Sequence, residues 1–489
     1  MRRGASPSRE VFVLSRLPAV LTLSATLAAV HAGPVSAQTP AQALPQPAAK
    51  AAPSPAWLDG YRETAARLVG AAMVDQFAWR RLATLTDGIG ARLSGSPELT
   101  RAIDWALAEM KRDGLENVHL EPVMVPHWVR GRESLQIVEP APHQVVMLGL
   151  GDSVGTPQDG VQAEAIVVRS FDELDAAASR VKGRIVVFNV PFTTYDATRP
   201  YRGDGPSRAA RHGAVAALVR AVGPAGLRLP HTGGLNYAAN VPKIPAAAIT
   251  SEDADRLQRM SERGDRIVLK LQMEAHFEAD APSANVVGEI RGREKPDELV
   301  VIGGHIDSWD VGAGASDDGG GIVATWEALR LIKSLGLRPR RTLRVVLWTN
   351  EENGTRGGRA YRDAHLAELP KHVMMLEADS GLFRPVSFGV TANNTARDTV
   401  RAIASLLTNI EADTVTPGGG GSDIGPSVTA AAIPALSYEG TGDYFLLHHT
   451  PADTVDKIEP VDVSRAAAAI AVMSYVIADV PQRLGTSAE

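Results

Sequence analysis

Apolar runs that alternate with helical segments occupy the chain from residue 284 onward, and this alternation constrains the fold more than any other feature. Such runs are typical of strands buried on both faces of a sheet, and helices between them are typical of parallel connections. The predicted strands are 298–303, 342–348, 373–377 and 434–438. The predicted helices are 320–335, 357–369, 395–409 and 461–480. We therefore predict an α/β fold with a mostly parallel sheet that is flanked by helices.

The sequence before residue 284 divides into two parts that differ in their pattern of apolar and turn-forming residues. Residues 57–125 contain helical patterns followed by one alternating strand, and we assign them to the same domain as residues 284–482. In residues 126–283, short β-like runs are separated by Pro and Gly turns, with only brief helical pieces. This pattern predicts a β-rich domain inserted into the α/β domain, with residues 483–489 as a tail.

The N-terminal end has the pattern of an export signal rather than of a folded element. Residues 1–37 combine an Arg-rich start, an apolar stretch at 17–30 and small residues at 35–37, which are typical of a cleaved signal peptide. The apolar stretch is too short and too broken to span a membrane, so we expect no stable membrane anchor after cleavage. Residues 38–56 are rich in Ala, Pro and Gln and predict a disordered linker. The mature protein is therefore expected to be secreted or periplasmic.

The composition excludes several classes of function. The chain of 489 residues contains no cysteine, so disulfides, thiolate metal sites, iron–sulfur clusters and a cysteine nucleophile are excluded. Any metal ion must be held by His and carboxylate side chains. The formal net charge of -6, without a basic run, also argues against a nucleic-acid partner.

Polar side chains gather where the predicted strands end. One group follows the first strand, an acidic pair follows the second, an Asp follows the third, and another acidic pair opens the helix between the first two strands. In chain order these residues are His305, Asp307, Asp317, Asp318, Glu351, Glu352 and Asp379. Because ligands of open α/β sheets bind beyond the carboxyl ends of the strands, we expect these side chains to share one rim.

The chemistry of this rim favours a metal site. Several carboxylates in a dry cleft repel one another unless they take up protons or bind cations. Carboxylate oxygens and a neutral imidazole suit zinc, and cobalt or manganese less selectively, and His448 or His449 would add a further imidazole. Singly, each group has an ordinary structural explanation, since Asp is a frequent helix cap and polar pairs are common in loops. Their joint position at strand ends favours one or two divalent ions.

Four short motifs support this interpretation by resemblance. They are Gly-Gly-His-Ile-Asp-Ser-Trp-Asp-Val-Gly at 303–312, Ser-Asp-Asp-Gly-Gly-Gly at 316–321, Asn-Glu-Glu at 350–352 and His-Thr-Pro-Ala-Asp-Thr at 449–454. They resemble the co-catalytic di-zinc exopeptidases, the family of leucyl aminopeptidases, carboxypeptidase Q and glutamate carboxypeptidases, and its carboxypeptidase Q group most. The region 126–283 also resembles a protease-associated domain, through more weakly specific stretches at 182–186, 211–214 and 244–246. The resemblance spans nearly all of the mature chain.

The resemblance implies a ligand set for two Zn²⁺ ions per chain. By position, Asp317 would bridge the two ions. His305 and Asp379 would hold one ion, and Glu352 and His449 would hold the other. The family pattern places His449 rather than its neighbour at the ligand position.

The resemblance also implies roles for residues beside the ligands. Glu351 would be the general base, and Asp307 would orient the imidazole two residues before it. Asp318 follows the bridging Asp through a peptide bond that is typically cis in the family. Three further side chains are candidates for contacting the substrate or the developing oxyanion, without a choice between the two tyrosines: Tyr438, Tyr444 and His448.

The function implied is that of an exported zinc-dependent exopeptidase acting on short peptides or dipeptides. A free terminus needs a charged anchor, and Arg356, Arg359 and Arg384 lie near the motifs in sequence, but the end that is trimmed stays open. The Gly-rich residues 418–423 are predicted to form a substrate-side loop. A short peptide is the expected partner, and a second copy of the chain is kept as a candidate partner in a homodimer.

Other functions remain as alternatives. The same scaffold suits a zinc amide hydrolase or acyltransferase that acts on a non-peptide, or a receptor-like binding protein without catalysis. Residues 151–155 match the Gly-x-Ser-x-Gly elbow of serine hydrolases around Ser153. The residues that follow indicate a turn and not the helix that this elbow requires, so we interpret the match as fortuitous.

Overall fold

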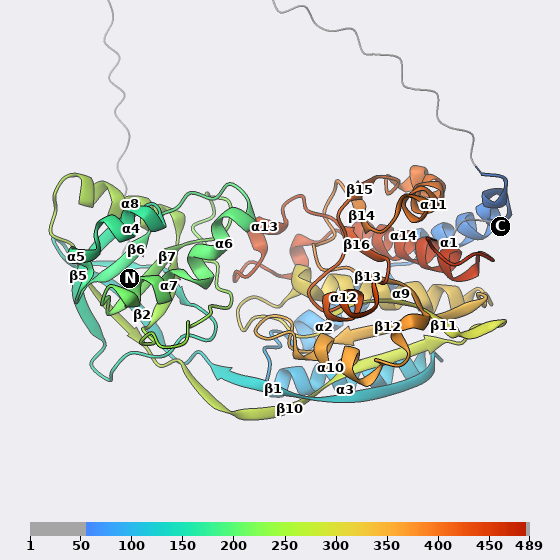
Figure 1. Cartoon of the computed structure of the whole chain (residues 1–489), viewed down its shortest axis with the longest axis horizontal. Helices are drawn as coiled ribbons and strands as arrows, with labels where there is room; N and C mark the ends of the chain where they lie inside the picture. The colour runs from blue at the N-terminus through green and yellow to red at the C-terminus, as the bar shows by residue number, and fades with distance from the viewer. Residues whose placement is uncertain (1–54, 486–489) are drawn as a thin grey trace, which may run out of the picture. The chain divides into compact units, whose positions relative to one another are not determined.

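The computed structural model describes residues 55–485 of the chain (Figure 1). The predicted signal peptide at 1–37 lies outside the described residues, as does nearly all of the predicted linker at 38–56. The last four residues of the predicted tail also lie outside them.

The first of two eight-stranded sheets has the order β1-β10-β12-β11-β13-β16-β14-β15. The central strands β12, β11, β13 and β16 are parallel, whereas β1, β10 and β14 pair antiparallel with their inner neighbours. The prediction of a mostly parallel sheet therefore describes the centre of the sheet. The strands are β1 (Glu116–Val129), β10 (His276–Ile290), β11 (Lys295–His305), β12 (Arg341–Trp348), β13 (His372–Glu377), β14 (Ser387–Thr391), β15 (Val415–Pro417) and β16 (Ala435–Glu439).

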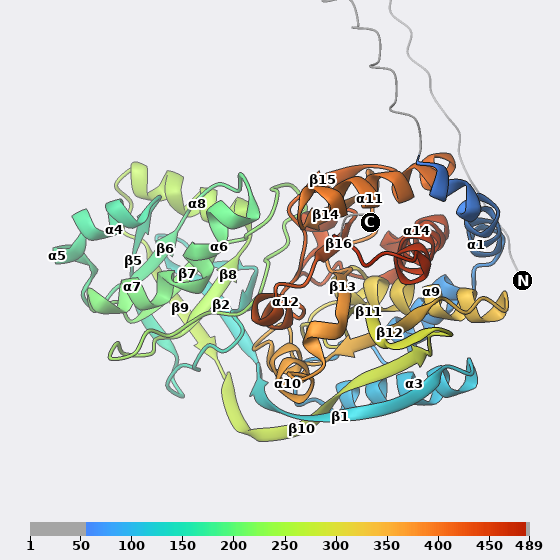
Figure 2. The same ribbon diagram turned by 45° about the vertical axis from the view of Figure 1, so that its right-hand side comes forward.

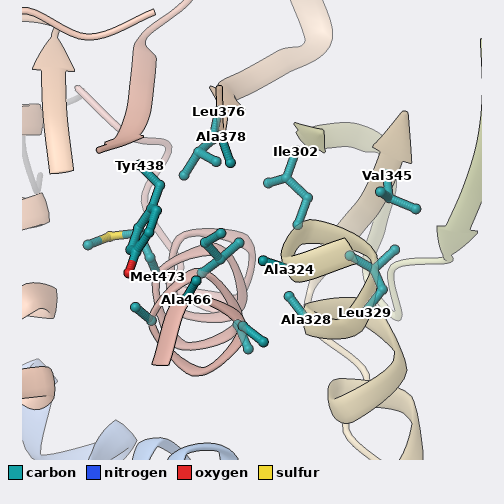
Figure 3. Packing of buried hydrophobic residues seen from close by; sticks show 14 of the residues in the cluster. Ile302, Ala324, Ala328, Leu329, Val345, Leu376, Ala378, Tyr438, Ala466 and Met473 are labelled. Carbon is teal, nitrogen blue, oxygen red and sulfur yellow. The ribbon is translucent and has the colours of Figure 1, made fainter. Parts of the chain in front are cut away.

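Helices cover both faces of this sheet, as the apolar runs predicted. Ile302 and Val345 point to one face and pack against α9 and α14, as Figure 3 shows, whereas Val301 and Val346 point to the other face. The helices of the first face are α1 (Arg62–Val74), α2 (Phe77–Gly88), α3 (Pro97–Arg112), α9 (Gly320–Ser334), α11 (Asn394–Ala404) and α14 (Pro460–Asp479). Those of the second are α10 (Arg356–Ala364) and α12 (Gly425–Ala431).

The C-terminal helix α14 is a core element. It is long and apolar enough to cross a membrane, yet 94% of its apolar window is buried inside the protein. It contacts α9 and α1, and small side chains such as Ala466 lie along the contact (Figure 3). A helix that is apolar on all sides belongs in such an interior.

The second sheet has the order β3-β2-β9-β5-β6-β7-β8-β4 and is formed entirely by residues between β1 and β10. We call residues 130–275 the inserted region. Its strands are β2 (Glu133–Glu139), β3 (His143–Val145), β4 (Met147–Gly149), β5 (Val161–Val168), β6 (Ile185–Phe188), β7 (Ala216–Arg220), β8 (Ala246–Ile249) and β9 (Val268–Met273). Its helices are α4 (Phe171–Ala176), α5 (Ala178–Val181), α6 (Tyr195–Gly203), α7 (Gly205–Arg211) and α8 (Ser251–Glu262).

The structure differs from the sequence prediction at the limits of this insert. The predicted region 126–283 begins inside β1 and ends inside β10, because these strands pair from Glu116 with Glu289 as far as Val129 with His276 (Figure 2). Pro126 suggests a break, but an edge strand tolerates proline, and the pairing shifts register there. The insert contains eight strands and five helices, so the brief helical pieces expected from its sequence are present beside the strands.

Candidate metal centre

The predicted site residues lie at one edge of the first sheet. His305 ends β11 and pairs in register with Trp348, the last residue of β12, so the loop that carries Glu351 and Glu352 starts beside it. Asp379 follows β13, the strand on the other side of β11. Two further segments reach this edge, the short helical turn η2 (Ala315–Gly319) with Asp317 and Asp318, and the loop after α13 (Tyr444–Leu447) with His448 and His449.

The Asp317 carboxylate lies between two imidazoles. Its Oδ1 atom lies 3.2 Å from His305 Nε2, and its Oδ2 atom lies 3.2 Å from His449 Nε2. A second carboxylate approaches each imidazole nitrogen, Asp379 at 3.4 Å from His305 and Glu352 at 3.1 Å from His449. The five side chains therefore form two groups of three that share Asp317.

These distances fit two tetrahedral zinc ions. Ligand atoms about 2.0–2.1 Å from a tetrahedral ion lie about 3.3 Å from one another. The side chains are buried except for that of Asp379, which is partly exposed. Asp317 Oδ2 accepts no hydrogen bond from the described part of the chain. The same edge offers further oxygen and nitrogen atoms close enough to take part, from Asp318 beside His305 and Asp379, and from His448 beside His449.

His448 lies near the cluster but is oriented less favourably than its neighbour. Its Nε2 atom lies 3.6 Å from Asp317 Oδ2, and its ring stacks on the His449 ring with centroids 3.6 Å apart. The His449 ring in addition faces Glu352. This geometry agrees with a ligand at His449 and a substrate contact at His448.

The charges of the cluster are balanced either by extra protons or by a bound cation. Burial raises the pKa of Glu352 to about 8, and the Asp317 carboxylate adds to the rise. Burial also raises the pKa of Asp379 to about 7, although the His305 imidazole lowers it. Burial opposes protonation of His305, but Asp379 and the hydrogen bond to Asp317 raise its pKa well above the ordinary value. Without metal the site thus holds extra protons, and divalent ions replace protons at such sites.

A buried arginine, which no sequence motif indicated, supports the loop behind the ligands. Arg92 is fully buried and donates hydrogen bonds to the backbone oxygens of Ile306, Gly90, Ala313 and Gly314. Burial lowers its pKa to about 10, so the guanidinium stays charged at neutral pH. It therefore offsets part of the negative charge of the acidic cluster.

The backbone of the bridging Asp is fixed by two neighbouring carboxylates. Asp453 accepts hydrogen bonds from the amides of Ser316, at 2.6 Å, and Asp317, at 3.1 Å. Asp318 accepts one from the His305 amide at 3.0 Å, and the peptide bond between Asp317 and Asp318 is cis, as the resemblance implied. A Cβ atom at Gly304 would collide with Asp318 Oδ2, so only glycine fits there.

Asp307 contacts the His305 imidazole through its backbone and not through its carboxylate. The Nδ1 atom of His305 lies 3.0 Å from the backbone oxygen of Asp307 but 3.8 Å from its carboxylate. The carboxylate instead accepts hydrogen bonds from the amides of Glu351, at 3.1 Å, and Glu352, at 3.4 Å. Asp307 therefore orients the imidazole through its carbonyl group and positions the acidic pair through its side chain.

The two candidate tyrosines lie in different places. Tyr438 is buried in the core with its ring against Phe388, and Figure 3 shows it beside Met473 of α14. Its position on β16 turns its side chain to the face that α14 covers, so Tyr438 does not line the cavity over the cluster. The prediction of Tyr438 as a contact of the oxyanion is therefore wrong. Tyr444 lines that cavity. Burial raises its pKa well above the ordinary value, and the Asp317 carboxylate contributes.

A cavity of about 660 Å³ lies over the cluster, within the size range of small-ligand sites. Glu351 and Ser422 line it from the first sheet, the latter from the Gly-rich loop. The inserted region contributes residues that the sequence did not indicate, because no motif marks them: Asp152, Tyr195, Arg199, Arg202 and Asn236. Both sheets therefore form the walls of the cavity.

The arginines expected near the site do not line this cavity. Arg356 pairs with Asp280 at 2.6 Å, and Arg384 lies 3.5 Å from Asp462. Arg359 donates to the Thr355 hydroxyl on its own helix end. These three arginines therefore lie near the motifs in sequence but do not contribute to the cavity.

The Ser153 hydroxyl is likewise unavailable as a nucleophile. It donates to the Val154 backbone oxygen and accepts from the Ala246 amide. The side chain is fully buried. The structure therefore agrees with the rejection of a serine-hydrolase elbow.

Comparison with protein families gives a match to a family described as peptidase family M28, at residues 285–474. Carboxypeptidase Q of Mus musculus is 44% identical over 430 residues, which cover 87% of this chain and 92% of the mouse protein. Carboxypeptidase Q of Homo sapiens is 45% identical over 410 residues, which cover 84% of this chain and 87% of the human protein.

Solved structures show the same fold. The peptidase M28 precursor of Shewanella amazonensis is similar with a TM-score of 0.84 and 33% identity, over 87% of this chain and 98% of that chain. A zinc aminopeptidase of Bacillus subtilis is similar with a TM-score of 0.63 and 20% identity, over 83% of this chain and 96% of that chain. At 20% identity the second similarity concerns the fold alone.

Proposed function

The chain belongs to peptidase family M28 and is a metallo-exopeptidase, and from this premise we propose that it is an exported zinc enzyme that hydrolyses short peptides or dipeptides. The observation that carries the proposal is the Asp317 carboxylate, whose two oxygens each lie 3.2 Å from a different imidazole. Each of these imidazoles has a second carboxylate beside it, at 3.4 Å for His305 and at 3.1 Å for His449. This arrangement matches the ligand set that two bridged zinc ions need.

In this proposal, His305 and Asp379 hold one ion, Glu352 and His449 hold the other, and Asp317 is shared. When bound, the ions lower the pKa of a water molecule and polarise a carbonyl oxygen. The cysteine-free chain supplies the imidazole and carboxylate ligands that zinc accepts.

Glu351 is proposed as the general base. It lines the cavity, and its backbone amide is bound by Asp307, so the adjacent Glu352 can face the cluster while Glu351 faces the substrate. Its carboxylate accepts a proton from the attacking water and then donates that proton to the leaving amine. Tyr444, which lines the same cavity, is proposed to donate a hydrogen bond to the oxyanion that forms on the scissile carbonyl.

Charged residues of the inserted region are proposed to recognise the free termini. Arg199 on α6 lines the cavity, is exposed, and forms no ion pair with an acidic side chain of the described residues. A guanidinium in this state suits the carboxylate of a C-terminal residue. Asp152 lines the same cavity and suits a free amine. A peptide that contacts both Arg199 and Asp152 must place its free C-terminus and its free N-terminus in one cavity, so the pair favours short peptides.

The test is hydrolysis by the zinc-loaded mature protein of dipeptides with free, N-acetylated or C-amidated ends, with a chelator control. We expect cleavage of free dipeptides, weaker cleavage of the blocked ones, and loss of activity with the chelator. In Arg199→Gln, KM for free dipeptides should rise about tenfold, the effect of one lost ionic hydrogen bond, while KM for C-amidated ones stays constant. Arg180→Gln, which changes an exposed arginine of α5 outside the cavity, is the matched control.

Two outcomes would contradict the proposal. Absence of cleavage of every peptide by a zinc-loaded protein would favour the amide hydrolase or acyltransferase. Absence of bound zinc would favour the receptor-like binding protein.

The remaining parts of the proposal concern the whole chain. We propose that residues 1–37 direct export and are removed, that the inserted region is a protease-associated domain, and that no membrane anchor remains. Mass spectrometry of the exported protein should find an N-terminus near Gln38. Sedimentation of that protein would decide whether two copies associate.

A further inference from the structure

The inserted region touches one of the proposed ligands directly. We propose, resting on the proposed zinc site, that the inserted region is a structural part of the metal centre, because Thr232 and Arg202 hold the His449 imidazole in its ligating orientation. The second ion would then depend on the inserted region, whereas the first ion would not.

Thr232 binds His449 at two points. The Thr232 amide donates a hydrogen bond to the His449 backbone oxygen at 3.0 Å. The Thr232 backbone oxygen lies 3.3 Å from Nδ1 of the His449 ring. Thr232 itself is anchored in the inserted region, since its hydroxyl donates to the Gly149 backbone oxygen at 2.7 Å.

The second of these contacts determines which ring nitrogen is free to bind metal. A neutral imidazole carries one N–H, and a ligating nitrogen must be the other one. When Nδ1–H donates to the Thr232 oxygen, Nε2 carries a lone pair and lies 3.2 Å from Asp317 and 3.1 Å from Glu352. The same atom accepts a hydrogen bond from the Trp309 indole N–H at 3.2 Å, which agrees with this tautomer. Outer contacts of this kind fix the tautomer and the ring orientation of metal-bound histidines.

Arg202 supports the Thr232 carbonyl from the other side. Its guanidinium is buried and donates from Nη1 to the Thr232 oxygen at 3.1 Å and from Nη2 to the Tyr195 hydroxyl at 2.7 Å. Its Nη1 atom also lies 3.3 Å from Nδ1 of His449, but both atoms carry hydrogen in this tautomer, so the two groups do not form a hydrogen bond with each other. Arg202 is therefore a positioning residue, which acts on the ion through Thr232 and His449.

The packing leaves no space for a side chain between these groups. Gly233 follows Thr232 with φ +126°, and a Cβ atom there would collide with Arg202 Nη1 and lie 2.6 Å from His449 Nδ1. The other imidazole is held within the first sheet, since Nδ1 of His305 faces the Asp307 oxygen at 3.0 Å. A substitution at Gly233 thus disturbs one half of the cluster.

The experiment compares Gly233→Ala with Gly226→Ala in the full mature protein. Gly226 has φ +127°, and a methyl group placed there would meet no atom within 4 Å, so this control reproduces the backbone strain without the collision. Zinc retained per chain is measured during equilibration with increasing chelator. We expect Gly233→Ala to lose its second ion at about 10–100-fold lower chelator activity, the usual effect of disturbing an outer contact. Gly226→Ala and the first ion should behave as in the parent protein.

Three further variants keep the test decisive. His449→Ala identifies the chelation step of the second ion, because that ion loses a direct ligand. Arg202→Met should lose the second ion at lower chelator activity than the parent protein. Arg202→Lys, which can still donate to the Thr232 oxygen, should show a smaller shift. The two Arg202 variants replace Gly233→Ala in the comparison if circular dichroism shows that Gly233→Ala does not fold.

The outcomes separate this inference from the proposed function. Failure of the parent protein to bind two zinc ions would contradict the proposed site itself. Two ions in the parent protein, with identical chelation curves for Gly233→Ala and Gly226→Ala or an equal shift of both ions, would overturn the inference alone. A shift confined to the second ion supports it.

Discussion

The two imidazoles of the metal cluster are held by different regions of the molecule. His305 ends the central strand β11, and its amide and its ring bind Asp318 and Asp307, both of the first sheet. His449 lies on a loop with φ 61°, and its ring faces Thr232, which is 217 residues away in sequence. One imidazole is thus positioned within the first sheet, whereas the other is contacted both by Trp309 beside the first sheet and by Thr232 of the inserted region.

The largest expected effect comes from removing the residue that both halves share. Asp317→Ala should release both zinc ions and lower kcat/KM by about 10⁴-fold, because metal activation is worth several kcal/mol and each 1.36 kcal/mol is tenfold. Zinc per chain and dipeptide hydrolysis measure this. Asp297→Ala, which removes an exposed carboxylate of β11, is the control. If one ion stayed bound, the two halves would be more independent than their shared carboxylate indicates.

The second largest effect is expected at Glu351, which is not one of the proposed zinc ligands. Glu351→Gln should keep both zinc ions and lower kcat by about 10³-fold, the loss typical of a missing general base. Single-turnover kinetics together with metal analysis measure it. Glu352→Gln is the paired control, because its carboxylate faces His449 and its loss should weaken the second ion. Normal turnover of Glu351→Gln would remove this residue from the mechanism.

A smaller effect separates the two tyrosines. Tyr444→Phe should lower kcat about 10²-fold with little change in KM, as for one lost oxyanion donor. Tyr438→Phe should leave kcat unchanged and stabilise the fold by about 1 kcal/mol, because the buried Tyr438 hydroxyl has no hydrogen-bond partner among the described residues. Steady-state kinetics and thermal unfolding distinguish them. Equal loss of kcat in both variants would contradict the assignment.

The smallest effect concerns the inserted side of the cavity. Burial raises the pKa of Asp152 to about 6, although the Asn353 hydrogen bond and Lys243 lower it. The folded protein therefore binds this proton more tightly than the unfolded chain, so the carboxylate destabilises the fold above pH 6, and stability is regained as the pH falls from about 6 to about 4.

Removing the charge should remove this pH dependence. Asp152→Asn should raise the free energy of unfolding at pH 7 by about 1–2 kcal/mol and by nothing near pH 4. Denaturant unfolding of the zinc-loaded parent and variant at both pH values measures the difference. A constant difference at both pH values would show that Asp152 does not titrate as the buried position requires.

The sequence predicted the part of the fold that repeats a simple pattern. Apolar runs identified the central strands β11, β12, β13 and β16, because each is buried on both faces. The short strands β14 and β15 at the edge have no such run and were not predicted. The ends of β1 and the whole of β10 were also missed; the outer parts of both strands are largely exposed and resemble loops.

The residues of the candidate site were predictable where they lie close in sequence to a predicted strand end or helix start. His305, Asp317, Glu352 and Asp379 lie within a few residues of a strand end or a helix start, so sequence position places them near the cluster. Arg202 and its neighbours in the inserted region reach the cavity through packing between sheets, which leaves no local signal. The choice between Tyr438 and Tyr444 needed the direction in which β16 presents its side chains, which sequence alone does not fix.

The link between Thr232 and His449 has a consequence for how substrates enter. Because that link joins the backbone and the ring of a proposed zinc ligand to the inserted region, the two sheets cannot swing apart without straining the ion's coordination. A bound ion would then restrain the two sheets, and peptides would enter the cavity without a large separation of the sheets. With this restraint, the fixed size of the cavity, about 660 Å³, would favour the short peptides that are proposed as substrates.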